Sequence, residues 1–272
     1  MAVTRRLSFA KPARLRVLVP SASLLALRVW ERNFQVFTKH WVGAVLAYFA
    51  DPIFYLTIFG IGLGGYIGGI QGESYLEFIA PGIIFGTAMV TVCMECTYGS
   101  FTRMEIQKTF EAIIATPVSI DDVIVGEILW GASKGLLTAA IIFLVVASLR
   151  LFHSPLVILI FPLVALEGVL LSSISLIVTS FASTYEYVNY YYALFMAPAF
   201  YLSGIFFPLE RFPTWLQHIA YLSPMTPLVI LARALNRGVV AGWMWGPLAW
   251  LLFLAGVSSA LAVVLMKRRL IK

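Results

Sequence analysis

Residues 123–149 read VIVGEILWGASKGLLTAAIIFLVVASL, a run in which Glu127 and Lys134 are the only charged side chains. A helix needs roughly 20 predominantly apolar residues to cross a hydrocarbon layer of about 30 Å, so this run predicts a transmembrane helix. Working outward, runs of the same character recur at 42–63, 78–98, 155–181, 190–207 and 245–266. The sequence therefore predicts six transmembrane helices joined by mostly short connections.

The composition agrees with a chain whose solvent is the bilayer. Of the 272 residues, 61% are hydrophobic and 12% are charged, whereas a soluble domain is about half apolar and a quarter charged. Barrel strands are short and alternate in polarity, so helices are the remaining way to satisfy the backbone in lipid. We expect one all-α polytopic domain over 41–266, a cytoplasmic segment at 1–40 and a basic tail at 267–272.

The net charge of +6 gathers at the two ends of the chain. Lysine and arginine are frequent before residue 40 and after residue 266, and the first outer loop, 64–75, has no basic residue. Because basic residues mark the cytoplasmic side and six spans return the chain to its starting side, both termini are expected in the cytoplasm. This placement indicates membrane topology and not nucleic-acid binding.

A helix beginning at Ser21 or Ser23 and running to about Lys39 is predicted to enter the domain. Its aromatic and aliphatic residues recur at helical spacing and its basic residues occupy the remaining faces, which is typical of an amphipathic helix in the membrane interface. An ordinary juxtamembrane segment is the alternative. The residues of the predicted apolar face are Leu27, Trp30, Phe34, Phe37 and Trp41.

Two connections carry structure of their own. On the inner side, 103–127 is rich in polar residues: Met104, Lys108, Glu111 and Ala112 fit a short helix that Pro117 ends. Ser119, with Asp121 and Asp122 after it, is expected to cap the next helix. On the outer side, 208–244 is apolar and broken by prolines, which favours re-entrant helices in the outer leaflet.

Ionisable groups inside a membrane are costly and are functional candidates by default. Here they are Asp51, Glu95, Glu127, Lys134 and Glu167. At about 1.5 Å rise per residue, Glu95 and Lys134 reach comparable depths on adjacent helices. We therefore hypothesise that they form an ion pair, which Glu127 shares, and which either fixes packing or lines a path for polar cargo. Asp51 precedes Pro52, where a kink with a satisfied carboxylate and a proton or sodium site are the alternatives.

The sequence lacks common motifs of nucleotide binding and of hydrolytic enzymes. It has no GxxxxGK[ST] phosphate loop, no HExxH and no GxSxG. The three histidines are scattered along the chain and make no metal set. Cys93 and Cys96 lie within an apolar run, where packing disfavours the reactive thiolate, so they are expected to be inert. An enzyme is disfavoured, and no cofactor is expected in this chain.

The sequence resembles the permeases of type-2 ABC exporters, in particular the nodulation protein J branch. The resemblance covers nearly the whole chain beyond Arg28, and the order of its pieces is more specific than any one of them. The matching pieces are Arg32-Asn33, Asp51-Pro52, Tyr55-Leu56, Gly62-Leu63-Gly64, Ser74-Tyr75, Phe78, Pro81-Gly82, Glu95, Tyr98-Gly99, Phe101, Arg103-Met104, Gln107, Thr109, Glu111-Ala112-Ile113, Thr116-Pro117, Gly126-Glu127, Trp130, Lys134, Leu202-Ser203-Gly204, Phe207-Pro208, Pro213, Gln217-His218, Pro224, Arg233 and Arg268-Arg269-Leu270.

The resemblance implies a homodimer in the bacterial inner membrane that works with two cytoplasmic P-loop ATPase subunits, which hold ATP and Mg. In this family the inner helix after span 2 inserts into a cleft of the ATPase. On this chain the implied coupling residues are Gln107, Lys108, Glu111, Ala112, Thr116 and Pro117, with Tyr185 and Glu186 as a second contact.

The resemblance also implies a cargo. The nodulation branch exports lipid-modified chito-oligosaccharides, and other relatives export glycolipids, polysaccharides or drugs. Aromatic residues with hydroxyls suit an amphiphile with a sugar end, and an interfacial aromatic belt is the alternative role; the residues are Tyr190, Tyr191, Tyr192 and Tyr201. The rival functions are a drug-exporting or antibiotic-exporting ABC permease, an ion-coupled secondary transporter using Asp51 or Glu95, and a membrane enzyme acting on lipid.

Overall fold

The computed structural model describes residues 22–67, 69–70 and 72–271, apart from the side chains at positions 44, 47–49, 51 and 52. The N-terminal segment expected at 1–20, Ser21 as a helix cap and Lys272 lie outside these residues. Within the described part, four helices are long and apolar enough to cross a membrane, and a bent pair of shorter helices would make a fifth. The all-α, polytopic character predicted from the sequence is confirmed.

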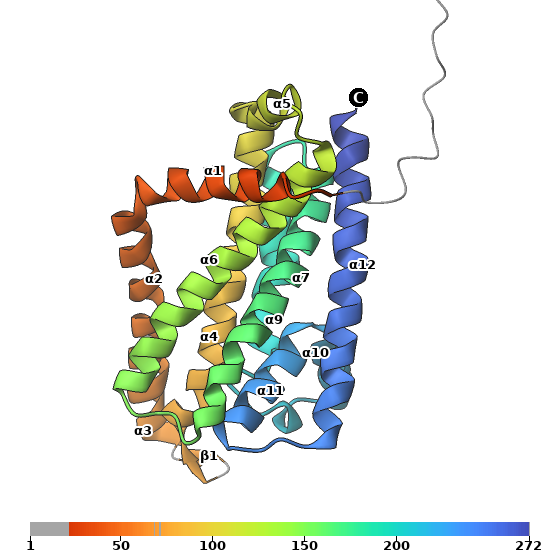
Figure 1. The fold of residues 1–272 in the computed structure, drawn as a ribbon. Coiled ribbons are helices and arrows are strands. Elements are labelled where there is room, and N and C mark those ends of the chain that lie inside the picture. Colours follow the sequence, from red (N-terminus) through yellow and green to blue (C-terminus); the bar gives the residue numbers. More distant parts are fainter. Residues whose placement is uncertain (1–21, 68, 71, 272) are drawn as a thin grey trace, which may run out of the picture.

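The four long helices stand side by side in one bundle (Figure 1). Three of them extend beyond the regular α-helix that gives them their label, through π-helical or 3₁₀ turns. The α-helical parts are α4 (Tyr75–Met94), α6 (Ile120–Ser148), α7 (Ile160–Phe181) and α12 (Trp245–Leu270), and the full helical runs are Tyr75–Ile106, Ile120–Ser148, Pro155–Phe181 and Gly242–Leu270.

Two further helical runs cover the remaining expected spans, 42–63 and 190–207. They are α2 (Trp41–Tyr55) with Leu56–Leu63 and α3 (Gly64–Ile67), and α8 (Tyr185–Tyr191) with Tyr192–Met196 and α9 (Ala197–Leu202). Neither is among the four long apolar helices. The second run includes Glu186, Asn189 and several tyrosines, which make it more polar than a typical span. The count of six spans therefore stays a prediction.

A short hairpin leads into α4. β1 (Gly69–Ile70) pairs antiparallel with β2 (Glu73–Ser74). Gly72, in the turn between them, has a φ of 86°, a conformation that favours glycine. Ser74 and Glu77 then form a capping box that begins α4.

α1 (Ala26–Thr38) lies across one end of the bundle (Figure 1). Its packed face agrees only in part with the predicted apolar face. It buries Ala26, Val29 and Asn33, and Trp30 and Phe37 are half-buried, whereas Leu27 and Phe34 are exposed. The missing side chain of Gly126 explains the close contact between α1 and α6. A Cβ placed on Gly126 of α6 would lie 2.6 Å from the Val29 Cβ and 2.8 Å from the Ala26 carbonyl oxygen, so glycine permits the close crossing of the two helices.

The opposite end of the bundle is closed by a bent pair of helices. α10 (Thr214–Leu222) and α11 (Met225–Asn236) meet at 89°. Flanking them are the 3₁₀ turns Leu209–Arg211 and Gly242–Met244. Residues of α11, including Leu228 and Leu231, belong to the large apolar core that is centred on α4. The pair occupies the stretch predicted to re-enter the outer leaflet, and its place in a membrane stays a prediction.

The inner connection is shorter than predicted. The second helix continues to Ile106 and does not end near residue 98, so Met104 belongs to this long helix and not to the short helix of the connection. The short helix is α5 (Thr109–Ile114), and Pro117 follows it. The predicted cap of the next helix is confirmed, because Ser119 and Asp122 form a capping box at the start of α6.

Replacing Ser119 with alanine is expected to lower the free energy of unfolding by about 1 kcal/mol, because the Asp122 backbone N–H loses its side-chain acceptor. The measurement is the midpoint of thermal unfolding in detergent. Ser148→Ala is the matched control, since the Ser148 hydroxyl donates to the Val145 carbonyl at the exposed end of the same helix. Equal loss of stability in both variants would contradict a capping role for Ser119.

Candidate functional site

One end of the bundle, called the inner end because it carries the connection predicted to face the cytoplasm, presents α5 between two long helices. Lys108, directly before α5, has a φ of 54°, a left-handed conformation that turns the chain into the short helix. Phe110 is fully buried in an apolar cluster together with Phe101, Met104 and Met266 from the inner ends of two long helices. This buried ring anchors α5 firmly to the bundle although the helix is short.

The predicted coupling residues form the exposed side of α5 and its flanks. All six are exposed, and they are Gln107, Lys108, Glu111, Ala112, Thr116 and Pro117. The Lys108 ammonium lies 3.3 Å from the Glu111 carboxylate, whose hydrogen bond and charge raise the pKa of Lys108. The Thr116 hydroxyl donates to the Ile113 carbonyl over 2.6 Å and closes the end of the helix. An anchored helix with an exposed polar face suits contact with a partner protein.

The second predicted contact lies at the start of α8. Tyr185, Glu186 and Tyr187 are exposed. The Tyr185 hydroxyl lies 2.8 Å from the Thr102 hydroxyl, and its ring stacks on Tyr98 with centroids 5.4 Å apart. Tyr185 therefore ties α8 to the helix that leads into α5.

Four charged side chains meet in the interior of the bundle, close to the end that carries α5. The Lys134 ammonium lies 2.5 Å from one Glu95 oxygen, and the Arg103 guanidinium lies 2.7 Å from the other. Arg103 also lies 2.6 Å from Glu127, whose side chain is 1% exposed. The hypothesised partners Glu95 and Lys134 are thus brought together, and Arg103 joins the two carboxylates into one network.

Neutral donors complete this network. The Trp130 indole N–H donates to Glu95 over 2.9 Å, while Ser100 and Asn33 donate to Glu127 over 2.6 and 2.8 Å. Asn33 comes from α1, so the network also holds the entry helix. These residues were not among the predicted site residues. The one signal in the sequence was that Asn33, Trp130 and Arg103 belong to the pieces of the family resemblance.

The other predicted intramembrane acids are placed differently. Glu167 is fully buried on α7, and neither carboxylate oxygen has a hydrogen-bond partner among the described residues. The side chain of Asp51 lies outside the described part of the structure. Cys93 and Cys96 are free thiols and both are buried, as predicted.

The four predicted cargo-path tyrosines do not gather on one surface. Tyr191 is buried, with its hydroxyl 3.3 Å from the Ser175 hydroxyl. Tyr190, Tyr192 and Tyr201 are exposed. Successive helix residues point about 100° apart, so Tyr190 and Tyr192 flank the buried side of their helix.

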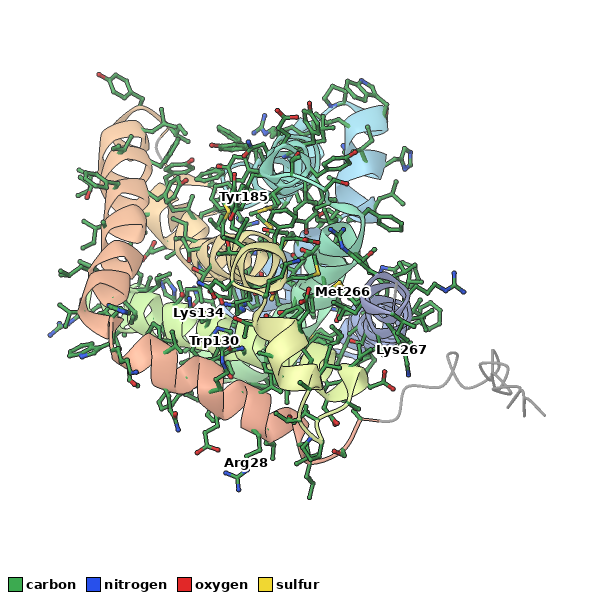
Figure 2. All side chains as sticks on the ribbon, turned by 90° about the horizontal axis from the view of Figure 1, so that it is seen from above. Arg28, Trp130, Lys134, Tyr185, Met266 and Lys267 are labelled. Carbon is green, nitrogen blue, oxygen red and sulfur yellow. The ribbon has the colours of Figure 1, made fainter. Side chains whose placement is uncertain are left out.

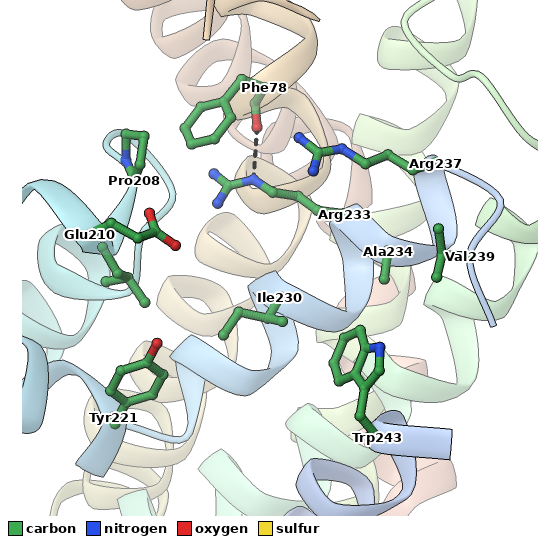
Figure 3. Close-up of a pocket in the computed structure, with 11 residues that line it drawn as sticks. Phe78, Pro208, Glu210, Tyr221, Ile230, Arg233, Ala234, Arg237, Val239 and Trp243 are labelled. Carbon is green, nitrogen blue, oxygen red and sulfur yellow. Dashed lines mark hydrogen bonds between the residues drawn. The ribbon is translucent and has the colours of Figure 1, made fainter. Parts of the chain in front are cut away.

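At the opposite end of the bundle from α5, Arg233 links three segments of the chain. The Arg233 guanidinium donates to the carbonyls of Phe78, Gly204 and Ile205 over 3.1, 2.6 and 3.0 Å, and its centre lies 3.6 Å from the centroid of the Phe78 ring. It borders a cavity of about 260 Å³ (Figure 3). Because these carbonyls come from α4 and from the turn after α9, Arg233 ties α11 to both.

A bundle of long apolar helices with an anchored, exposed helix at one end is the architecture of an integral membrane protein. The chain belongs to the ABC-2 type transporter family, whose model matches residues 25–235.

The relatives agree with this assignment. Nodulation protein J of Sinorhizobium fredii is 31% identical over 95% of this chain and 98% of its own length. Nodulation protein J of Bradyrhizobium diazoefficiens is 36% identical over 77% of this chain and 81% of its own length. The inner membrane transport permease YadH of Escherichia coli is 27% identical over 74% of this chain and 78% of its own length. The resemblance to nodulation protein J seen in the sequence is confirmed.

Proposed function

We propose that the chain is the permease subunit of an ATP-driven exporter that moves a lipo-oligosaccharide, a glycolipid or a similar amphiphile outward across the bacterial inner membrane. The family and the likeness to nodulation protein J support this function. The chain has no phosphate-binding loop, so ATP and Mg belong to two separate P-loop ATPase subunits that bind a permease homodimer.

In this proposal the chain spans the membrane six times with both termini in the cytoplasm. The end of α12, with Lys267, Arg268 and Arg269, lies at the same end of the bundle as α5 (Figure 1). The first described residues lie there too, since the Ser23 backbone N–H donates to Asp122 at the start of α6. Basic residues favour the cytoplasmic side, which supports this orientation.

The observation that carries the coupling role is the way α5 is tied to the bundle. Phe110 anchors it in the core, and the neighbouring Glu105 binds Arg269 of α12 over 2.7 Å. Asp121 at the start of α6 binds Lys267 over 2.9 Å. A displacement of α5 by a closing ATPase dimer would therefore move the inner ends of three long helices together.

The test is to purify the chain in mild detergent from its native host at natural expression and to identify the proteins that co-purify. A stoichiometric P-loop ATPase is expected, and Glu111→Ala with Thr116→Ala should remove at least about 90% of it, because the contact face of α5 is lost. The matched control is Glu210→Ala with Thr214→Ala, the same pair of changes at exposed positions of the opposite end.

Two outcomes would contradict the proposal. A chain that elutes without an ATPase, and whose transport in vesicles follows a proton or sodium gradient and ignores ATP, would identify an ion-coupled carrier. An ATPase lost equally from both double variants would show that α5 is not the contact.

A further inference from the structure

A pocket of about 470 Å³ opens at the inner end, between α1, the helix Tyr75–Ile106 and α6. It adjoins the flank of α5 at Gln107, and its remaining lining residues come from outside α5. In the view down the bundle, Trp130 and Lys134 lie between α1 and α4 (Figure 2). The lining residues that matter here are Arg32, Phe37, Glu95, Arg103, Trp130 and Lys134.

The charges at this pocket leave one cation without a carboxylate. Arg103 is shared by Glu95 and Glu127, and Lys134 binds Glu95. The guanidinium of Arg32 donates to the side chain of Asn33 over 2.9 Å, and among the described residues no carboxylate forms an ion pair with it. Three cations against two carboxylates leave a surplus of one positive charge, which Arg32 carries.

The surroundings of Arg32 favour an incoming anion. Partial burial and the positive charge of Arg103 lower the pKa of Arg32, and the negative charge of Glu127 opposes them. A guanidinium that has lost part of its water shell beside a second cation gains most from a bound carboxylate or phosphate, which it contacts through two parallel N–H groups.

Part of the pocket lining is aromatic. Phe37 packs edge-on to Trp130 with centroids 5.7 Å apart, and the Lys134 ammonium lies 5.6 Å from both ring centroids. Rings beside cations, next to a helix that lies across the end of an apolar bundle, fit the boundary between the head group and the chain of an amphiphile. A small free anion would leave the rings without a contact.

We propose that this pocket binds the acidic head group, phosphate or carboxylate, of an amphiphile, and that Arg32 selects for its negative charge. For a transported amphiphile the inference rests on the proposed function, and for a membrane lipid it goes beyond that function. It applies equally to a membrane lipid and to a transported amphiphile, and it is tested on the permease without an ATPase.

The experiment measures lipid retention by native mass spectrometry of the purified full chain. Phosphatidylglycerol and phosphatidylcholine with identical acyl chains serve as probes. We expect wild-type protein to retain the acidic lipid about tenfold better and Arg32→Gln to lose that preference. Arg32→Lys should keep only part of it, because the ammonium keeps the charge and loses the two parallel N–H groups. Arg28→Gln is the matched control, one turn away on α1, where the side chain is 74% exposed and bound to Glu31. It should stay within about twofold of wild type.

Three results would overturn the proposal. The first is equal retention of the two lipids by the wild type. The second is equal loss in the Arg28 and Arg32 variants, which would indicate only the net charge of α1. The third is displacement of phosphatidylglycerol by equimolar inorganic phosphate, since the aromatic lining would then contribute nothing. A normal gel-filtration profile of Arg32→Gln separates loss of the site from loss of the fold.

Discussion

Replacing Arg103 with glutamine is expected to destabilise the folded permease by about 3–5 kcal/mol, because the change removes one partner of a buried ion-pair network. Glu127 would keep Asn33 and Ser100 as donors but would lose its counter-charge in the interior. Glu95 would keep Lys134 and Trp130. The loss is therefore expected to centre on Glu127, and it is measured as a fall in the thermal unfolding midpoint in detergent.

A second substitution tests this origin. Arg103→Gln combined with Glu127→Gln removes one positive and one negative charge and leaves the Glu95–Lys134 pair intact. The double variant is expected to recover most of the stability lost by Arg103→Gln, as in a double-mutant cycle with strong coupling. Additive losses would show that Arg103 stabilises the helix end through packing and not by charge.

The Glu95–Lys134 contact could be inferred from sequence because helix geometry fixes depth. Two apolar runs on adjacent antiparallel helices and a known rise per residue place the two side chains at similar heights. The ion pairs of Arg103 could not be inferred in the same way, because the helix was expected to end near residue 98. Basic residues near a span end usually mark the cytoplasmic side, and only the tertiary arrangement shows that this one turns inward to two carboxylates.

The packed face of α1 could be predicted only in part, for a different reason. Lipid and protein interior are both apolar, so hydrophobic periodicity does not distinguish the face that meets lipid from the face that meets other helices. The large residues Leu27 and Phe34 are exposed, whereas Ala26 and Val29 pack on Gly126. Small residues at helical spacing were the better signal.

The same principle predicts a second strongly damaging change in the bundle. A Cβ added to Gly168 of α7 would lie 2.6 Å from the Ala132 Cα and 2.9 Å from its Cβ. Backbone atoms cannot move aside as the end of a side chain can, so Gly168→Val would force α6 and α7 apart. Overpacking typically lowers the free energy of unfolding by about 1–3 kcal/mol and occasionally by more. Because the new side chain would collide with backbone atoms, we expect a loss at the upper end of this range. We expect most of the monodisperse protein to be lost in fluorescence-detected gel filtration.

Gly256→Val is the matched control, because Gly256 lies within α12 and a Cβ there would meet no atom within 4 Å. Both variants replace a helical glycine with the same β-branched residue, so helix propensity changes equally. Only the space available to the new side chain differs. If both variants elute as wild type, the close approach of α6 and α7 does not limit stability. If both are lost, the cause lies in the helices themselves and not in the seam between them.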